Sequence, residues 1–407
     1  MGYKLLSKLY YADKKSYMET YEKRLNSEST YKFDFKIKGN TGFVVINNDI
    51  LERINKIFKL DKHLLRCTKS VPPIALDEYR KKCLIDEIKM TNDIEGVQST
   101  RKEINDILND ASEKSEKKRL YGIVKKYEML MDQSDINLKT CEDIRKLYNE
   151  FTLTDVINEK PENKPDGIIF RKEPVYIYDN KQKIIHRGIN PEEDIIDTMT
   201  KSLEMLNNDD YNFLIRIAVF HYMFGYIHPF YDGNGRTSRF ISSYLLCKDL
   251  EYLVSYRISY TIRENLKKYY KSFDIVNDEK NKGDMTSFVI TFLDFIIESM
   301  IDLCSSLIER REKLDFYGNI NEIIADGDVK LEDILFILIQ NELFGEDGIS
   351  VYTLAKASQI SKTTVRKIIK KLEEKDLIIK SKIGNKNLYN IDLDKFLNLY
   401  EKSENEE

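Results

Sequence analysis

The twelve residues from 228 to 239 read HPFYDGNGRTSR and combine a histidine, a carboxylate, a glycine-flanked loop and two arginines. An imidazole can accept and return a proton near neutral pH, and a carboxylate oxygen suits a hard metal ion. Gly233 and Gly235 lack a Cβ, so the backbone there can approach a phosphate closely. Arg236 and Arg239 lie three residues apart, which places both guanidinium groups on one face of a helix. The segment therefore predicts a site that handles nucleotide phosphates.

Two helices must position this segment. The apolar run 215–227 predicts a buried helix, Pro229 and the glycines interrupt it, and a second helix is expected to begin at Arg236. The phosphates would then face a helix N-terminus, where free N–H groups and the helix dipole favour an anion.

The segment resembles the signature of the Fic family, His-Pro-Phe-x-Asp/Glu-Gly-Asn-Gly-Arg-x-x-Arg, and matches it at every fixed position. The family is known for transferring AMP from ATP to a hydroxyl side chain of another protein. The resemblance implies a mainly α fold class, with a Fic helical core and a β-hairpin flap, and it implies ATP and Mg²⁺ as ligands. The target protein cannot be named from the sequence.

The resemblance also implies a role for each motif residue. His228 would be the general base toward the acceptor hydroxyl, which suits a neutral imidazole, and Asp232 would hold Mg²⁺. Asn234 would cradle the α- and β-phosphates, Arg236 would meet the β-phosphate and Arg239 the γ-phosphate. The other motif positions expected at the nucleotide are Gly233, Gly235, Thr237 and Ser238. Doc-type kinases replace the second glycine with a bulkier residue, so a glycine at that position favours AMP transfer.

Residues 91–96, TNDIEG, resemble the family's inhibitory motif, Ser/Thr-x-x-x-Glu followed by Gly or Asn. In such proteins the glutamate pairs with the second motif arginine and keeps it from ordering the γ-phosphate. Here the resemblance implies a bidentate pair between Glu95 and Arg239. Two other interpretations stay open. A helix from about Leu76 simply ends with Gly96 as its C′ residue, or Glu95 orients a water molecule that removes AMP from modified targets.

A β-hairpin is predicted between Asp166 and Arg187, with strand-like residues 167–171, a strand from Val175 to Tyr178 and a turn at 179–180. The resemblance implies a flap that holds the target segment over the motif by main-chain pairing; a plain connecting hairpin is the alternative. As a flap, it would line the nucleotide with Val175, Tyr176, Ile177 and Tyr178.

Tyr269, Tyr270 and Asn277 fall where relatives place adenine contacts, although a core or surface role fits the tyrosines nearly as well. Among the other histidines, His221 is expected in the core. His186 and His63 receive no role.

Composition fits a globular protein, with 42% hydrophobic and 33% charged residues in a chain of 407. The 65 basic and 69 acidic residues give a net charge of -4, so no global attraction to nucleic acid or to a membrane is indicated. The cysteines at 67, 83, 141, 247 and 304 are odd in number and lack metal-binding spacing, which indicates reduced thiols in a cytoplasmic protein. No signal peptide is expected. The apolar segment 288–308 carries a charged face, which argues against a membrane span.

Residues 331–391 resemble a winged helix-turn-helix, with helices at 331–343, 351–357 and 361–375 and a hairpin with Gly384 and Asn385 at its tip. Residues 361–390 contain nine basic and three acidic residues, a local charge of +6. This pattern suits contact with the phosphate backbone of duplex DNA. A docking or dimerisation module is the open alternative, and homo-oligomerisation is not decided.

Four sections are expected along the chain. They are an N-terminal region of mixed strand and helix at 1–73 with strands at 30–38 and 42–46, a Fic catalytic domain including the inhibitory helix at 74–310, a linker at 311–330 and the winged helix domain at 331–400. Two functions remain in view: an adenylyltransferase restrained by Glu95, and a DNA-binding regulator whose Fic core senses nucleotide. His228 favours the enzyme, since a sensor needs no base.

Overall fold

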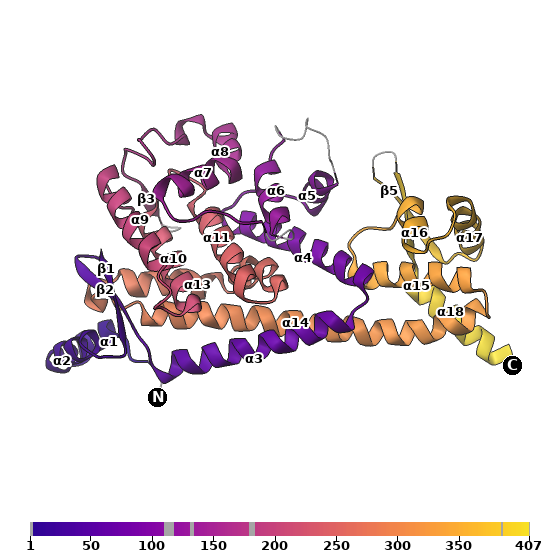
Figure 1. Ribbon diagram of the computed structural model, residues 1–407, viewed down its shortest axis with the longest axis horizontal. Helices are drawn as coiled ribbons and strands as arrows, with labels where there is room; N and C mark the ends of the chain where they lie inside the picture. Colours follow the sequence, from indigo (N-terminus) through magenta and orange to yellow (C-terminus); the bar gives the residue numbers. More distant parts are fainter. Residues whose placement is uncertain (1–2, 110–117, 131–133, 179–183, 384–385, 407) are drawn as a thin grey trace. The chain divides into compact units, whose positions relative to one another are not determined.

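The computed structural model describes residues 3–109, 118–130, 134–178, 184–383 and 386–406 (Figure 1). Helices dominate it, and the strands of the described residues form three separate two-stranded antiparallel sheets. The predicted mainly α fold class is therefore confirmed. Within the described ranges, none of the helices has both the length and the apolar character needed to cross a membrane.

The chain forms two compact units whose boundaries differ from those predicted at 73 and 310. The first unit comprises residues 1–62 and 84–301, and the second comprises residues 63–83 and 302–407. Three long helices run through these boundaries: α3 (Asn48–Ser70), α4 (Pro73–Ile94) and α14 (Thr286–Ala325). Most of the expected linker at 311–330 is helical, because α14 continues to Ala325 through a stretch that contains no proline.

The N-terminal residues pack into the first unit. They form α1 (Leu6–Ala12), α2 (Lys14–Leu25) and the hairpin of β1 (Thr30–Ile37) and β2 (Asn40–Val45), close to the predicted strands. Phe43 N–H donates to the Gly283 carbonyl at 3.1 Å, and Met285 N–H donates to the Phe43 carbonyl at 2.8 Å. These main-chain bonds join the hairpin to the start of α14.

Helix α10 (Phe213–Ile227) lies in the core of the first unit, and twelve of its fifteen residues are buried. The predicted buried helix before the motif is thus confirmed, and α10 packs against α9 and α11. The other helices are α5 (Arg101–Leu108), α6 (Tyr121–Met129), α7 (Cys141–Phe151), α8 (Leu153–Glu159), α9 (Glu192–Leu206), α11 (Asn234–Asp249), α12 (Ile258–Glu264) and α13 (Leu266–Asn277), with short 3₁₀ turns at Pro161–Asn163, Tyr252–Tyr256 and Glu279–Asn281.

The predicted hairpin is present as β3 (Tyr176–Tyr178) and β4 (Ile184–Arg187), paired antiparallel. Its expected turn at 179–180 lies outside the described residues. The strand-like interpretation of 167–171 was wrong, because residues 167–170 form bends and Arg171 has no regular secondary structure. The carboxylate of Glu192 accepts the N–H groups of Ile168, Ile169 and Phe170 at 3.0, 2.8 and 2.8 Å. A side chain thereby takes the donors that a partner strand would have used.

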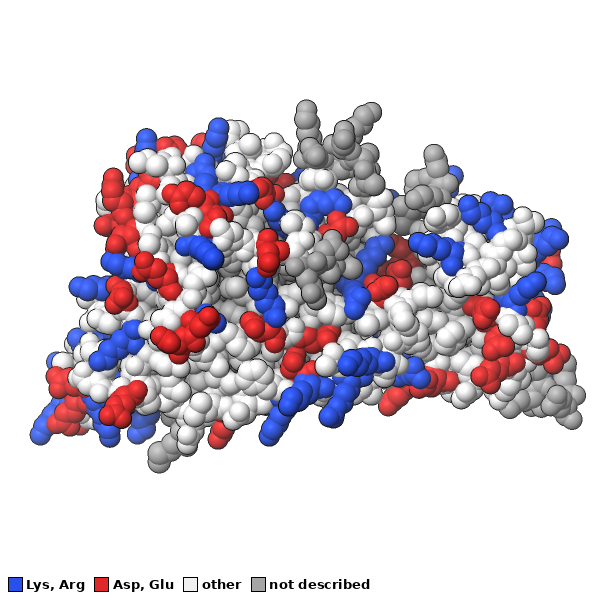
Figure 2. Space-filling model, in the orientation of Figure 1, with Lys and Arg blue, Asp and Glu red and all other residues white. Residues whose placement is uncertain are grey.

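The second unit contains the predicted winged helix. Its elements are α15 (Val329–Phe344), α16 (Val351–Ala357), α17 (Lys362–Glu374), β5 (Ile378–Ile383), β6 (Lys386–Ile391) and α18 (Leu393–Glu406). The apolar side of α17 is buried, whereas its basic side chains lie at the surface, where blue side chains gather in Figure 2. The predicted tip of the wing, residues 384–385, lies outside the described residues.

We expect Glu192→Ala to lower the free energy of unfolding by about 1–3 kcal/mol, because three main-chain donors lose their acceptor. The rate of amide hydrogen exchange at Ile169 and Phe170 should rise in the same variant. The matched control is Glu193→Ala, since Glu193 is exposed in the same first turn of α9. Equal exchange in both variants would show that Glu192 does not hold this segment.

Candidate active site

The histidine of the motif ends α10 in a left-handed conformation. His228 has φ 52° and ψ 62°, and its N–H still donates to the Phe224 carbonyl at 3.0 Å. Such a conformation is unfavourable for a residue with a Cβ, so the surrounding contacts must hold it. It turns the chain out of the helix and into the glycine loop.

The loop after His228 is closed by the side chain of Asn234. Its Oδ1 accepts the N–H of Phe230 at 3.0 Å, and its Nδ2 donates to the Phe230 carbonyl at 2.8 Å. These two bonds fix the five-residue loop. The amide side chain therefore shapes the loop, and its predicted contact with phosphates stays a prediction.

A neighbouring helix, α7, supports the same loop. The ring of Tyr148 stacks on Phe230 with centroids 3.6 Å apart, and its hydroxyl donates to the Asp232 carbonyl at 3.1 Å. Gly233 has φ 76°, and a Cβ there would lie 3.0 Å from Thr152 Oγ1. Sequence reasoning missed Tyr148, because its position in α7 signals only an apolar helix face.

Helix α11 begins at Asn234, two residues earlier than predicted, with Gly233 as its N-cap. The Thr237 hydroxyl donates to the Gly233 carbonyl at 2.8 Å, and the Ser238 hydroxyl donates to the Gly235 carbonyl at 3.2 Å. Both hydroxyl protons are therefore used inside the helix. The main-chain N–H groups of the first turn are the donors that a helix N-terminus offers to an anion.

Both motif arginines project from α11 into the interior, with side-chain exposures of 1%. Arg236 Nη2 lies 4.0 Å from Asp232 Oδ1, and Nε and Nη1 have no hydrogen-bond partner among the residues that the structure describes. A buried cation with unused donors is costly unless an anion approaches it. This observation fits the phosphate ligand expected from the motif.

Arg239, in contrast, is engaged by the end of α4. Its Nε donates to Thr91 Oγ1 at 2.8 Å, and its Nη2 donates to the Thr91 carbonyl at 3.0 Å and to Glu95 Oε1 at 2.7 Å. The ion pair with Glu95 is present, but the predicted bidentate geometry was wrong. Thr91 takes Nε, so the carboxylate has a single hydrogen bond to the guanidinium group.

The carboxylate of Glu95 is ionised in this setting. Burial opposes its charge, but Arg239 and then Arg236 hold its pKa below the usual range. Helix α4 ends at Ile94, and Gly96 has φ 73°, as a C′ glycine would. Helix α4 therefore ends as the alternative interpretation of this segment predicted, and Glu95 also forms the ion pair with Arg239.

Gly235 leaves the space that Glu95 occupies. A Cβ at this position would overlap with Glu95 Oε1 and would lie 3.0 Å from Arg239 Nη1. The sequence predicted a glycine for close approach of a phosphate, and the structure adds that the same glycine makes room for the carboxylate.

The segments on both sides of the hairpin are fastened to the motif by Arg171, which is fully buried. Its Nε donates to the His228 carbonyl at 2.9 Å, its Nη1 to the Glu173 carbonyl at 2.6 Å and its Nη2 to the Ile189 carbonyl at 2.8 Å. Sequence reasoning missed this residue, because a single arginine in a hairpin has no pattern that distinguishes it from a surface residue.

The imidazole of His228 is neutral near pH 7. Burial, followed by His186 and Arg171, lowers its pKa to about 4, and Glu95 opposes the shift. Its Nδ1 has no hydrogen-bond partner within the described ranges. A neutral imidazole can accept a proton, which is the property required of a base.

The residues predicted at the adenine divide into two groups. Tyr269 is buried and shares a hydrogen bond of 2.8 Å with His221 Nε2, while Asn277 Oδ1 accepts from Tyr222 at 2.6 Å. The Tyr269 hydroxyl and Asn277 Oδ1 are thus bonded to residues of the core, and His221 is buried there as expected. Tyr270 is 46% exposed and leaves a ring for stacking.

In the predicted flap, Tyr176 is 37% exposed. It pairs with Arg187 across the hairpin, as Ile177 pairs with His186. The Val175 carbonyl accepts the Gly188 N–H at 3.0 Å. For Tyr178 only the backbone is described. The nucleotide contacts expected of these residues stay predictions.

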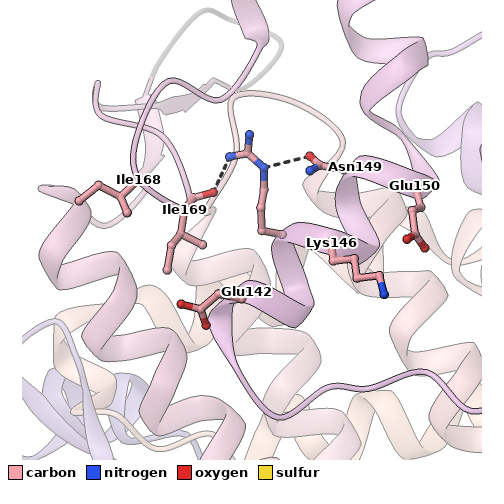
Figure 3. Close-up of a pocket in the computed structure, with 7 residues that line it drawn as sticks. Glu142, Lys146, Asn149, Glu150, Ile168 and Ile169 are labelled. Atoms are coloured by element: carbon pink, nitrogen blue, oxygen red, sulfur yellow. Dashed lines mark hydrogen bonds between the residues drawn. The ribbon is translucent and has the colours of Figure 1, made fainter.

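A surface hollow between α7 and residues 168–169 is separate from this site (Figure 3). Arg145 crosses it and donates to the Ile169 carbonyl and to Asn149 Oδ1. Glu142, Lys146 and Glu150 add charges of both signs at its edge. No motif residue lines the hollow, and we assign it no role.

We expect Arg171→Met to raise the pKa of His228 from about 4 toward the ordinary histidine value, because a nearby positive charge is lost and the hairpin is released from the motif. Titration of the histidine resonances by NMR measures this shift. Lys172→Met is the matched control, since Lys172 is exposed and carries the same charge. An unchanged His228 pKa in Arg171→Met would contradict the assignment.

Comparison with known proteins agrees with this geometry. Residues 140–246 match the Fic/DOC family, and residues 341–386 match the MarR family. A Fic family protein from Desulfovibrio desulfuricans has a similar structure, with a TM-score of 0.51, 18% identity and coverage of 85% of this chain and 97% of that one. This likeness shows a shared fold.

Two further structures match with lower scores. A Fic domain containing signalling protein from Bacteroides thetaiotaomicron has a TM-score of 0.43, 16% identity and coverage of 65% of this chain and 97% of that one. Fic-1 from C. elegans has a TM-score of 0.45, 17% identity and coverage of 64% and 74%. From the family matches and the motif, residues 140–246 form a Fic domain of the Fic/DOC family, and residues 341–386 belong to a C-terminal winged helix domain of the MarR family.

Proposed function

We propose that the protein is an adenylyltransferase that transfers AMP from ATP to a hydroxyl side chain of a target protein, and that Glu95 restrains it. The observation that carries the proposal is the state of the two buried arginines. Arg236 keeps unused donors beside the glycine loop, and Arg239 is bound by Glu95. A triphosphate can give each of the two guanidinium groups a ligand, whereas a ligand with a single phosphate would leave the second arginine unused.

The chemistry assigned to the site needs one base and several donors. His228 takes the proton of the acceptor hydroxyl, and the hydroxyl oxygen bonds to the α-phosphorus. The bond from that phosphorus to the bridging oxygen breaks, and pyrophosphate leaves. Arg236 and the first-turn N–H groups of α11 hold the phosphates. They also stabilise the negative charge that grows on the leaving pyrophosphate. The neutral state of His228 suits the first step.

Asp232 is the residue that would hold Mg²⁺. Its carboxylate is 37% exposed at the edge of the loop, where its Oδ1 accepts the Gly233 N–H at 2.5 Å. A hard carboxylate oxygen next to a phosphate-binding loop fits a metal ion that also binds phosphate. When bound, Mg²⁺ would neutralise part of the phosphate charge.

Restraint follows from competition for Arg239. The Glu95 carboxylate takes Nη2 and occupies the space beside Gly235. A γ-phosphate bears the same sign of charge as Glu95, so it cannot use Arg239 while the ion pair persists. ATP can still contact Arg236, but the α-phosphorus would then lack a fixed position relative to His228.

We expect Glu95→Gly to acquire the mass of AMP by self-modification when it is incubated with ATP and Mg²⁺, at a rate at least about tenfold above the native chain. A charge-assisted hydrogen bond contributes about 1.5–3 kcal/mol, and about 1.4 kcal/mol corresponds to tenfold in rate. Intact-protein mass spectrometry measures the product. The double variant Glu95→Gly with His228→Ala should gain no mass.

Two outcomes would count against this account. Modification that persists without His228 would remove its role as the base. Absence of AMP transfer by Glu95→Gly, both to itself and to proteins of a cell extract, would favour the alternative of a DNA-binding regulator that senses nucleotide. If Glu95 instead orients a water molecule, modified protein should lose AMP in the native chain and keep it in Glu95→Gly.

A second proposal concerns the winged helix, which we propose to contact duplex DNA through α17. The exposed basic residues of this helix are Lys362, Arg366, Lys367, Lys370 and Lys371. They lie opposite a buried face that includes Val365 and Ile369. One of them, Lys370, lies 3.9 Å from Glu374 at the surface, a contact that salt and phosphate can easily replace.

We expect the full chain to bind duplex DNA at low salt and to lose affinity steeply as salt rises, because cations are released from each contacted phosphate. Replacing Arg366 and Lys367 by alanine should weaken binding by at least about tenfold, as two phosphate contacts are lost. Lys395→Ala is the control, because Lys395 belongs to α18 and not to α17, and its charge is paired with Asp376 at 2.7 Å. Absence of binding at low salt would leave docking or dimerisation as the role of this domain.

A further inference from the structure

Two cysteines and a histidine that are scattered in the sequence meet in the second unit. His63 and Cys67 belong to α3, and Cys304 belongs to α14. Their ligand atoms all lie within 4.8 Å of one another, and His63 Nε2 is 3.9 Å from Cys67 Sγ. The cysteine spacing gave no indication of a metal site, because the third residue comes from a distant helix. We propose that these three side chains bind a thiophilic divalent cation of the Zn²⁺ type.

The positions of the three residues follow from helix geometry and packing. His63 and Cys67 are four residues apart, so both side chains lie on one face of α3. Cys67 and Cys304 are buried, at 8% and 4% exposure. Further along the same two helices, Arg311 Nη1 donates to the Ser70 carbonyl at 2.7 Å. The two segments are therefore held together independently of any ion.

The separations suit a tetrahedral ion. With a Zn–S distance of about 2.3 Å and a Zn–N distance of about 2.0–2.1 Å, ligand atoms in a tetrahedron lie about 3.6–3.8 Å apart. The observed 3.9 Å between the histidine and Cys67 is close to this range, and no pair in the group exceeds 4.8 Å. Side-chain rotations that move the ligand atoms by less than about 1 Å would bring all three to the distances of a tetrahedral site.

The donor set selects the kind of metal. Two thiolates and an imidazole favour Zn²⁺ and similar soft or borderline ions over Mg²⁺, which prefers oxygen. His63 is exposed, so a water molecule can supply the fourth ligand from the solvent side. Within the described ranges this is the one group of histidine, cysteine or acidic residues with such separations. A bound ion would join α3 to α14.

The test uses the full chain, reduced and treated with a chelator, and Co²⁺ as the probe. We expect one equivalent of Co²⁺ to give the strong visible bands of a tetrahedral site together with thiolate-to-metal charge transfer, and Zn²⁺ to displace it. A Co²⁺ ion held by Asp232 would have oxygen ligands and would show neither signal, so the two sites are distinguishable.

Variants identify the ligands. Cys67→Ser and Cys304→Ser should each abolish the charge-transfer spectrum or reduce it strongly, whereas Cys247→Ser, which removes a thiol elsewhere, should leave it unchanged. His63→Ala should weaken Zn²⁺ affinity at least about tenfold, by analogy with the cost of losing residues that support a metal site. Because His63 is exposed on its helix, this variant keeps the fold even if a buried cysteine variant does not.

Either of two results would overturn the proposal. One is the absence of a tetrahedral thiolate spectrum in reduced protein whose five cysteines all titrate as free thiols. The other is equal Zn²⁺ affinity in the native chain and in a folded His63→Ala variant.

Discussion

The structure of the site depends on three fully buried guanidinium groups, those of Arg171, Arg236 and Arg239. Removing a charge from water costs several kcal/mol unless partners replace the solvent, and each arginine meets this cost differently. Arg171 is satisfied by three carbonyl groups and Arg239 by Thr91 and Glu95. Arg236 lies near the Asp232 and Glu95 carboxylates, but its Nε and Nη1 have no hydrogen-bond partner among the described residues. The unused donors of Arg236 are the reason why we propose that a phosphate binds at the glycine loop.

The same constraint explains how the elements around the motif depend on one another. Arg171 joins the hairpin to His228, so the position of the hairpin and the position of the imidazole are coupled. Arg239 joins α4 to α11 through Thr91 and Glu95. Gly235 leaves room for the Glu95 carboxylate, so the residue that we propose lies close to a phosphate also permits the ion pair. In the proposed function, nucleotide binding and restraint thus use the same small region.

Much of this arrangement could be predicted from local sequence. The apolar run before His228, the break at the glycines and the helix-strand pattern of the winged helix each depend on neighbouring residues, and all three are present. The pairing of Glu95 with Arg239 was found through a motif, although its geometry was not, because Thr91 competes for Nε.

Other features depend on contacts between distant segments and had no local signal. Arg171 reaches across to His228, Tyr148 stacks on Phe230 from α7, and Glu192 takes the donors of a segment that reads as a strand. The meeting of His63 and Cys67 with Cys304 is of the same kind. For Tyr269 the sequence suggested a contact with the adenine, but the hydroxyl is bonded to His221 in the core.

In the proposed function, one ion pair decides whether Arg239 is available to the nucleotide. Crystal structures of the native chain and of Glu95→Gly, each with Mg²⁺ and a non-hydrolysable ATP analogue, would show whether it does. We expect Arg239 to contact the γ-phosphate in the variant and to stay with Glu95 in the native chain. A γ-phosphate bound by Arg239 in both structures, with the same placement of the α-phosphate relative to His228, would contradict it.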